Sequence, residues 1–208
     1  NGIVDNCRFE GNDAKLRGGA VYLQGSDEGN CTNTTFSNSV FIRNHADTNG
    51  GAIDWHEGAH EGTINNTVFE HNVANANGGA VYWRGHEGYI LNSNFTNNTA
   101  KGVNNGSYGN AGDGGAIFWA GIDGDVENCR FIDNKAEYHG VTTYGGRGGA
   151  VYLTQCDHGN KNTTFRNVYF ENNIAYTNGG AIDWHEGAED GKLDTAIFIN
   201  NTAYSNGG

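Results

Sequence analysis

Two identical segments carry the side chains best suited to chemistry. The phrase Ala-Ile-Asp-Trp-His-Glu-Gly occurs at 52–58 and again at 181–187. In an extended strand the Asp and the His point to the same face, and the Glu falls at the turn that follows. Carboxylate and imidazole groups together are able to hold a metal ion. The candidate metal ligands are Asp54, His56, Glu57, Asp183, His185 and Glu186.

A competing interpretation of these segments is that the residues only cap a solvated strand end and were copied by duplication. The helical zinc motif His-Glu-x-x-His is missing, because His60 follows Glu57 by three positions and no helix is predicted there. We therefore expect no cofactor, with calcium as the alternative.

Enzymatic cleavage of polysaccharides would need two carboxylates a few ångströms apart. Asp54 and Asp183 lie four repeats apart, which is roughly 19 Å at the spacing of paired strands. Since no unrepeated cluster of acids stands out, we expect no catalytic residues. A glycan-active lyase or hydrolase stays as the last alternative.

These segments belong to a phrase that recurs seven times. In each copy a Phe is followed three residues later by Asn and two residues further by Ala, and a Gly pair comes next. Stacked Asn side chains can form hydrogen-bonded ladders. The predicted ladder consists of Asn12, Asn44, Asn72, Asn98, Asn134, Asn173 and Asn201.

The spacing of apolar residues within one unit favours strands. Short runs of β-branched and aromatic residues alternate with a period of two, and the 34 Gly residues argue against helices. About three short strands per unit predict a parallel β-helix of about seven coils. Residues 1–208 then form a single array, a slice of a longer chain, in which 3–79 roughly resembles 125–208.

A motif pair links the chain to known surface proteins. Gly-Gly-Ala-Ile/Val stands at 18–21, 50–53, 78–81, 114–117, 148–151 and 179–182, each beside its Phe-x-x-Asn. This pair resembles the repeats of chlamydial polymorphic outer-membrane proteins and of adhesin-like surface proteins of methanogenic archaea. The many Asn residues and the lack of Pro favour the archaeal group. The resemblance implies a right-handed parallel β-helix displayed on a cell surface.

The composition indicates which classes of partner and which cellular location are expected. A net charge of −12 with only 12 Lys and Arg residues argues against nucleic acid as a partner. No apolar run is long enough to insert into a membrane. We expect an extracellular location, at the cell surface or in the envelope, where Asn-x-Ser/Thr triplets can be glycosylated. The candidate glycosylation sites are Asn30, Asn33, Asn65, Asn94, Asn97, Asn105, Asn162 and Asn200.

The four cysteines follow the duplication. Pairs Cys7–Cys31 and Cys129–Cys156 would be equivalent disulfides in an oxidising exterior. Alternatively, Cys7 and Cys129 are small buried residues two places before the Phe, which leaves the other two cysteines free for links between chains.

A Trp stands third after the Ala of the Gly-Gly-Ala motif in four units. Depending on the phase of the strand, this position is either part of the core or an outward aromatic column that binds sugars. The tryptophans are Trp55, Trp83, Trp119 and Trp184.

The predicted function is that of a non-catalytic cell-surface adhesin or structural stalk. The first alternative is an extracellular filament or envelope sheath that assembles by end-to-end stacking of β-helices, because open ends expose unpaired strands. The expected partners are accordingly other copies of the chain, or glycans and surface proteins of host or neighbouring cells.

Overall fold

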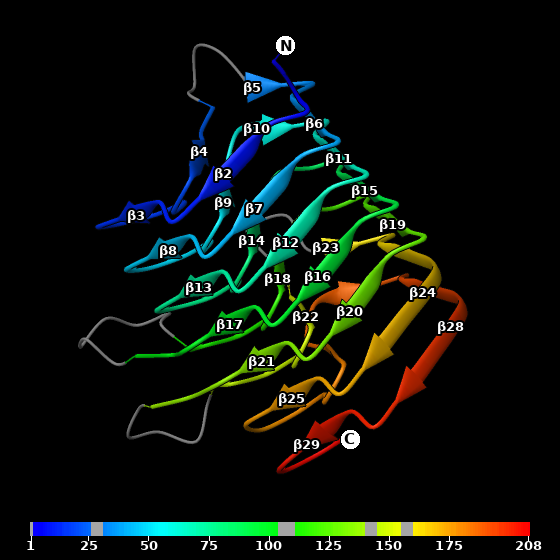
Figure 1. Ribbon diagram of the computed structural model, residues 1–208. Helices are drawn as coiled ribbons and strands as arrows, with labels where there is room; N and C mark the ends of the chain where they lie inside the picture. The colour runs from blue at the N-terminus through cyan, green and yellow to red at the C-terminus, as the bar shows by residue number, and fades with distance from the viewer. Residues whose placement is uncertain (1, 26–30, 104–110, 140–144, 155–159) are drawn as a thin grey trace.

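The computed structural model describes residues 2–25, 31–103, 111–139, 145–154 and 160–208 (Figure 1). In these residues the chain winds through short strands and contains no helix, and the named strands pair in parallel with their counterparts in the coils on either side. The protein is therefore a parallel β-helix, as the repeat predicted.

The strands stack in four columns. The first column consists of β1 (Ile3–Asp5), β6 (Thr35–Ser37), β11 (Thr63–Asn65), β15 (Tyr89–Leu91), β19 (Asp125–Glu127) and the first halves of β24 (Thr164–Glu171) and β28 (Lys192–Ile199). The second consists of β2 (Arg8–Glu10), β7 (Val40–Ile42), β12 (Val68–Glu70), β16 (Asn94–Thr96), β20 (Arg130–Ile132) and the second halves of β24 and β28. The third consists of β3 (Asp13–Ala14), β8 (His45–Ala46), β13 (Val73–Ala74), β17 (Thr99–Ala100), β21 (Lys135–Ala136), β25 (Ile174–Ala175) and β29 (Thr202–Ala203). The fourth consists of β4 (Val21–Leu23), β9 (Ile53–Trp55), β14 (Val81–Trp83), β18 (Ile117–Trp119), β22 (Val151–Leu153) and β26 (Ile182–Trp184). Two smaller pairs are β5 (Cys31–Thr32) with β10 (Ala59–His60) and β23 (Asn160–Lys161) with β27 (Ala188–Glu189).

The three strands predicted per coil correspond to three main sheets, the first of which is bent into two columns. The bend falls three residues before each Phe, at a residue with positive φ, as at Asn66 (φ 49°). Asn tolerates this left-handed conformation better than most residues, because its short side chain hydrogen-bonds locally. The bend residues are Asn6, Asn38, Asn66, Asn92, Asn128, Asn167 and Thr195.

The core is built from stacked aromatic rings. The seven Phe rings of the repeat follow one another at centroid distances of 4.5 to 5.0 Å, from Phe9 to Phe198. A second stack joins Trp83 to Trp55 at 4.3 Å and to Trp119 at 4.9 Å. All three indoles are fully buried. The Trp column is therefore core, and the outward alternative is wrong for these three residues.

The two glycines at 78–79 are needed for different reasons, the first for its backbone conformation and the second for its small size. Gly78, the first of its pair, has a φ of +65°, which an L side chain rarely adopts. At Gly79 an added Cβ would lie only 2.0 Å from the carbonyl oxygen of Gly115 in the next coil. The backbones of neighbouring coils thus approach each other too closely at this turn for any side chain.

In the part of the chain that the structure describes, no helix is long and apolar enough to cross a bilayer.

Candidate functional site

The two Asp-Trp-His-Glu segments lie on one sheet, formed by β4, β9, β14, β18, β22 and β26. The strand register places Asp54 between Tyr22 and Tyr82 of the adjoining coils. Ile53 and Trp55 point into the core, so alternation directs Asp54 to the outer face. The second segment occupies the same place in β26, where Asp183 lies opposite Tyr152.

An arginine from the preceding coil completes the first cluster. Nη1 of Arg17 lies 2.8 Å from Nε2 of His56, and Oδ1 of Asp54 lies 3.5 Å from Nδ1 of the same ring. Asp54 is fully buried, and among the described residues neither of its oxygens has a hydrogen-bond partner. Burial raises the pKa of Asp54, and this effect is opposed by His56, Arg17 and Arg84.

The second cluster repeats this arrangement. Nη1 of Arg147 lies 3.0 Å from Nε2 of His185. The guanidinium also donates to both oxygens of Asp113, at 3.1 and 2.5 Å, and lies 4.4 Å from the centre of the Tyr152 ring. Burial again raises the pKa of Asp183. The two clusters are separated by four strand steps, roughly 19 Å.

The predicted metal cluster is not assembled. No group of three or more His, Cys, Asp and Glu side chains is placed to hold a metal within the described ranges. Glu57 turns away from Asp54 and pairs with Arg84 of the next coil. The arginines donate to Nε2 of His56 and His185, which removes one ring nitrogen of each from metal binding. Glu186 is exposed at its turn. The clusters instead join neighbouring coils.

The seven repeat Asn side chains make a continuous hydrogen-bonded ladder. Nδ2 of Asn98 donates to Oδ1 of Asn134 at 3.0 Å and to the carbonyl oxygen of Phe69 at 3.1 Å. The same side-chain link runs from Asn12 through every repeat to Asn201. The left-handed residue at this corner is the one before the ladder Asn, such as Arg43 at φ 52°, rather than the Asn itself.

Sequence reasoning missed a second ladder, formed by the residues before four of the Gly pairs. The backbone N–H of Asn77 donates to Oδ1 of Asn49, and the backbone N–H of Asp113 donates to Oδ1 of Asn77. The backbone N–H of Arg147 donates in the same way to Oδ1 of Asp113. It also missed the link from Arg17 to His56. The signal was present, because Arg-Gly-Gly-Ala-Val-Tyr-Leu at 17–23 and 147–153 is duplicated together with the Asp-Trp-His-Glu segments.

The three cysteines that the structure describes form no disulfide. Cys7, Cys31 and Cys129 are free thiols, and Cys156 lies outside the described residues. Cys129 occupies the buried column two places before the Phe, where burial raises its pKa to about 12. This column also holds Ser93 and Thr67, so small size decides which residues fit there.

The candidate glycosylation sites differ in their surroundings. Asn94 and Asn200 are exposed, and Asn97 is half-buried. Nδ2 of Asn33 donates to Glu61, and that of Asn162 donates to Asp123. Two further candidates, Asn30 and Asn105, lie outside the described residues.

The triplet that begins at Asn65 is held by hydrogen bonds at both of its ends. It is half-buried and accepts a hydrogen bond from Asn92. The Thr67 of its triplet is fully buried and donates to the carbonyl oxygen of Asn65.

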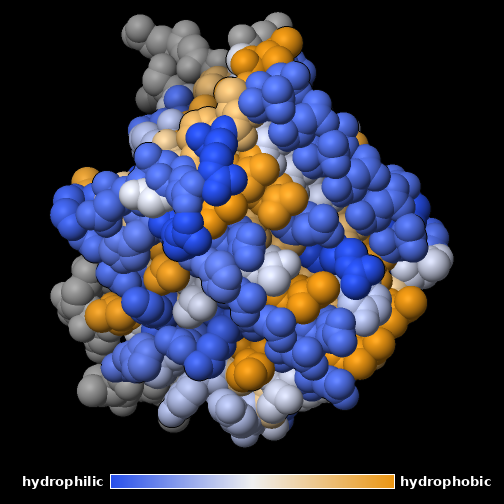
Figure 2. Space-filling model, in the orientation of Figure 1, coloured by the Kyte–Doolittle hydropathy of each residue, from blue (hydrophilic) through white to orange (hydrophobic). Residues whose placement is uncertain are grey.

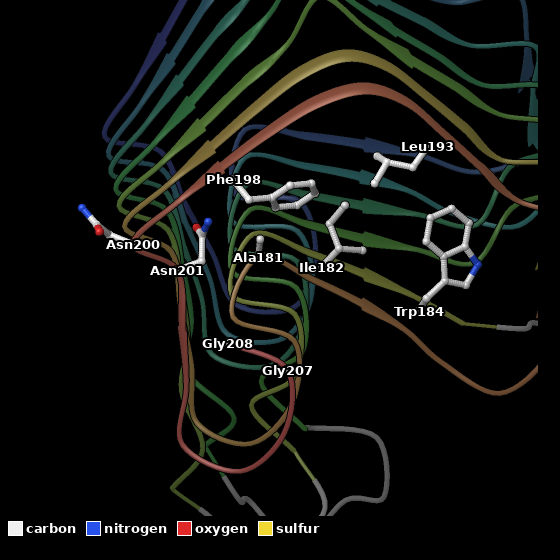
Figure 3. A pocket seen from close by; sticks show the side chains of 9 residues that line it. All are labelled: Ala181, Ile182, Trp184, Leu193, Phe198, Asn200, Asn201, Gly207 and Gly208. Atoms are coloured by element: carbon white, nitrogen blue, oxygen red, sulfur yellow. The ribbon is translucent and has the colours of Figure 1, made fainter.

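Much of the face shown in Figure 2 is hydrophilic, and hydrophobic residues form small patches on it. A hollow of about 420 Å³ opens at the last coil, where Figure 3 shows Leu193 near Trp184 and Phe198 on the other side of Ile182. Since these side chains belong to the core columns of the earlier coils, the hollow is the exposed interior of the β-helix rather than a pocket built from polar groups.

The fold and the repeated columns define a parallel β-helix repeat protein. Segments 38–54, 66–82 and 167–183 match the model of the Chlamydia polymorphic membrane protein repeat. The chain thus carries repeats of the chlamydial type, and such repeats indicate a surface-exposed protein. A search of the curated proteins and a search of the solved structures returned no match. The relation to archaeal adhesins stays a prediction.

Proposed function

We propose that this chain is a non-catalytic segment of an extracellular adhesin or stalk, which displays its loops at the cell surface. The observation that carries the proposal is the pair of unbroken side-chain columns. The Asn ladder runs from Asn12 to Asn201, and the Phe stack runs beside it from Phe9 to Phe198.

Continuous columns favour a stiff spacer. Each coil of such an array contacts mainly its neighbours, so the array lengthens without a larger core. Every ladder Asn between the ends bridges two coils with buried hydrogen bonds, which resist bending or slipping of one coil on the next. In the sequence, the extra residues of the longer repeats stand between the repeated motifs, and connecting segments of this kind tolerate variation and often carry binding residues.

The chemistry of the surface favours glycans or surface proteins as partners. The net charge of −12 disfavours polyanions, and Asn, Thr and Ser side chains offer neutral donors and acceptors. The test is adhesion of the purified chain, measured on arrays of glycans and on intact cells. Saturable binding supports the adhesin, whereas a stalk alone predicts none.

The non-catalytic part of the proposal has a separate test. The chain is incubated with acidic and neutral polysaccharides, and new reducing ends or unsaturated products are measured. Cleavage products that form only when the chain is present would contradict the proposal and support the glycan-active alternative. The Asp54→Asn and Asp183→Asn variants would then show whether the two outer-face carboxylates are responsible.

Assembly into filaments by stacking of coils is the second candidate. Among the described strands, β28 pairs on one side only, with β24, and the Phe198 and Leu193 side chains are 45% and 44% exposed. A further coil, whether from the same chain or a second copy, would continue both columns. Electron microscopy over a range of concentrations tests the idea. Filaments lost in a Phe198→Lys variant support it, and discrete rods at every concentration exclude it.

A further inference from the structure

We propose that His60 and His86 form an acid-sensitive seam between three neighbouring coils. The two histidines lie at the corner that follows the fourth strand column, after β9 and β14. Their rings stack face to face, with centroids 4.8 Å apart and planes within 8°. Nδ1 of His60 is 3.1 Å from the backbone nitrogen of His86, and Nδ1 of His86 is 3.4 Å from that of Ile122.

These contacts fix the protonation state of both rings. A backbone N–H can only donate, so Nδ1 of each ring must accept with its lone pair. Both imidazoles are then neutral and carry their proton on Nε2. A protonated ring has two N–H donors and no acceptor, so protonation and this hydrogen bond exclude each other.

In this seam an imidazole nitrogen accepts a backbone N–H of the neighbouring coil, whereas in the ladders a side-chain amide oxygen accepts it. In the Asn ladder the backbone nitrogen of Asn44 donates to Oδ1 of Asn72, and in the ladder before the Gly pairs that of Asn77 donates to Oδ1 of Asn49. An amide oxygen keeps its lone pairs at any mild pH, whereas histidine gains a proton in the mildly acidic range. Unlike these two amide contacts, the contact at His60 and His86 thus depends on an acceptor that can be protonated.

The surrounding charges do not replace the lost bonds. Protonation places two cations in rings that are 4.8 Å apart, which is repulsive. Glu61 and Glu87 follow the two histidines, and Asp123 follows Ile122; all three are exposed, at left-handed corners. The carboxylates of Glu61 and Asp123 accept instead from the side chains of Asn33 and Asn162. Among the described residues, the other titratable or charged groups on the neighbouring segments are Cys31, His56, Glu57 and Arg84.

The second copy of the duplicated block has no histidine at the position of His60. The first copy reads Trp-His-Glu-Gly-Ala-His-Glu-Gly at 55–62, and the second reads Trp-His-Glu-Gly-Ala-Glu-Asp-Gly at 184–191. Glu189 therefore stands where His60 stands. The stacked pair of histidines that accept backbone amides is therefore confined to the first block.

The test combines histidine NMR with amide exchange on the whole chain. Long-range ¹⁵N–¹H spectra at about pH 7.5 should show the Nε2–H tautomer for both rings, and the Nδ1–H tautomer would overturn the proposal. On going to about pH 5, across the histidine range, protection of the His86 and Ile122 amides should fall about threefold to tenfold. That is the change expected for one lost hydrogen bond. The amide of Asn44, on the Asn ladder of the same coils, is the internal reference.

Two variants distinguish protonation of His60 from a general effect of low pH on amide protection. Asn places an amide oxygen near the position of Nδ1 without a titratable proton, so His60→Asn should abolish the pH response of the His86 amide. His71→Asn is the matched control, because His71 is exposed and its ring contacts Glu70 at 3.5 Å. An unchanged pH response in His60→Asn would overturn the proposal. The tautomers are read on the unaltered chain and therefore decide the matter even if a variant folds poorly.

Discussion

Nδ2 of Asn98 lies 3.0 Å from Oδ1 of Asn134, one coil away, and both side chains are fully buried. The same Oδ1 accepts the backbone amide of Asn98. One oxygen thus satisfies a side-chain donor and a main-chain donor of the neighbouring coil. Repeated along the array, this contact provides buried hydrogen bonds at a corner where no strand ladder runs.

Removal of one member of the ladder should be costly. Asn98→Ala leaves the carbonyl oxygen of Phe69 and the amide of Asn72 without their partner. Each buried group left unsatisfied costs about 1–3 kcal/mol, so we expect a loss of about 3 kcal/mol or more in the free energy of unfolding. Denaturant unfolding measures it. Asn94→Ala, at an exposed position of the same coil, is the control and should change stability by less than about 0.5 kcal/mol. Equal midpoints for the two variants would refute the ladder's role.

Close approach of the coils leaves no room for a side chain at Gly79, the second Gly of its pair. In Gly79→Ala the new Cβ meets backbone atoms of Gly115 and Thr99 at 2.0–2.6 Å. Since backbone cannot rotate away, we expect a loss of about 3 kcal/mol or more, seen as a lower melting temperature. Gly11→Asn is the control, because an added Cβ there meets nothing within 4 Å and Asn tolerates positive φ. Similar melting temperatures would show that the coils separate easily.

The free cysteines should differ in reactivity. Cys7 is exposed, whereas burial raises the pKa of Cys129 to about 12, so at pH 8 it offers almost no thiolate. Alkylation followed by peptide mapping should label Cys7 quickly and Cys129 only after unfolding. A Cys7–Cys31 disulfide in the non-reduced map would instead restore the predicted staple.

Two aspartates should respond to pH in opposite directions. Burial raises the pKa of Asp54 above its ordinary value of 3.8, so the native state holds this proton more tightly than the unfolded chain does. Wild type therefore gains stability relative to Asp54→Asn as the pH falls through the raised pKa towards 3.8.

Hydrogen bonds from Ser37 and Asn38 lower the pKa of Asp5. Wild type therefore loses stability relative to Asp5→Asn as the pH falls below 3.8 through that lowered pKa. Melting temperatures of the three proteins between about pH 3 and pH 7 measure both trends. Parallel curves for all three would contradict the assigned environments.

Glycosylation of the folded chain should favour Asn94 over Asn65. Asn94 is exposed, whereas Thr67 of the Asn65 triplet is fully buried with its hydroxyl bonded to the backbone. An oligosaccharyltransferase acting on folded protein should modify Asn94 and leave Asn65 bare, as read by mass spectrometry. Unfolded peptides that contain each triplet are the controls, and both should be modified. Equal occupancy in the folded chain would contradict the burial of Thr67.

The sequence by itself determined the repeat, the parallel β-helix and the Asn ladder. A Phe, an Asn and an Ala in constant register from Phe9 to Ala203 can stack only if each unit occupies one coil, and a period of two excludes helices. The duplicated segments also pointed to the sheet on which Asp54 and Asp183 lie. These conclusions depend on spacing along the chain, which the sequence displays directly.

Only the tertiary structure decided what each outer residue contacts. Arg17 and His56 are 39 residues apart, and their contact depends on the length of the loop between them. The inward phase of Trp83, the free thiol of Cys7 and the backbone bond to His60 likewise depend on local turns. A one-residue change in a turn reverses the face of every following side chain, so such contacts are set by geometry that the repeat pattern does not encode.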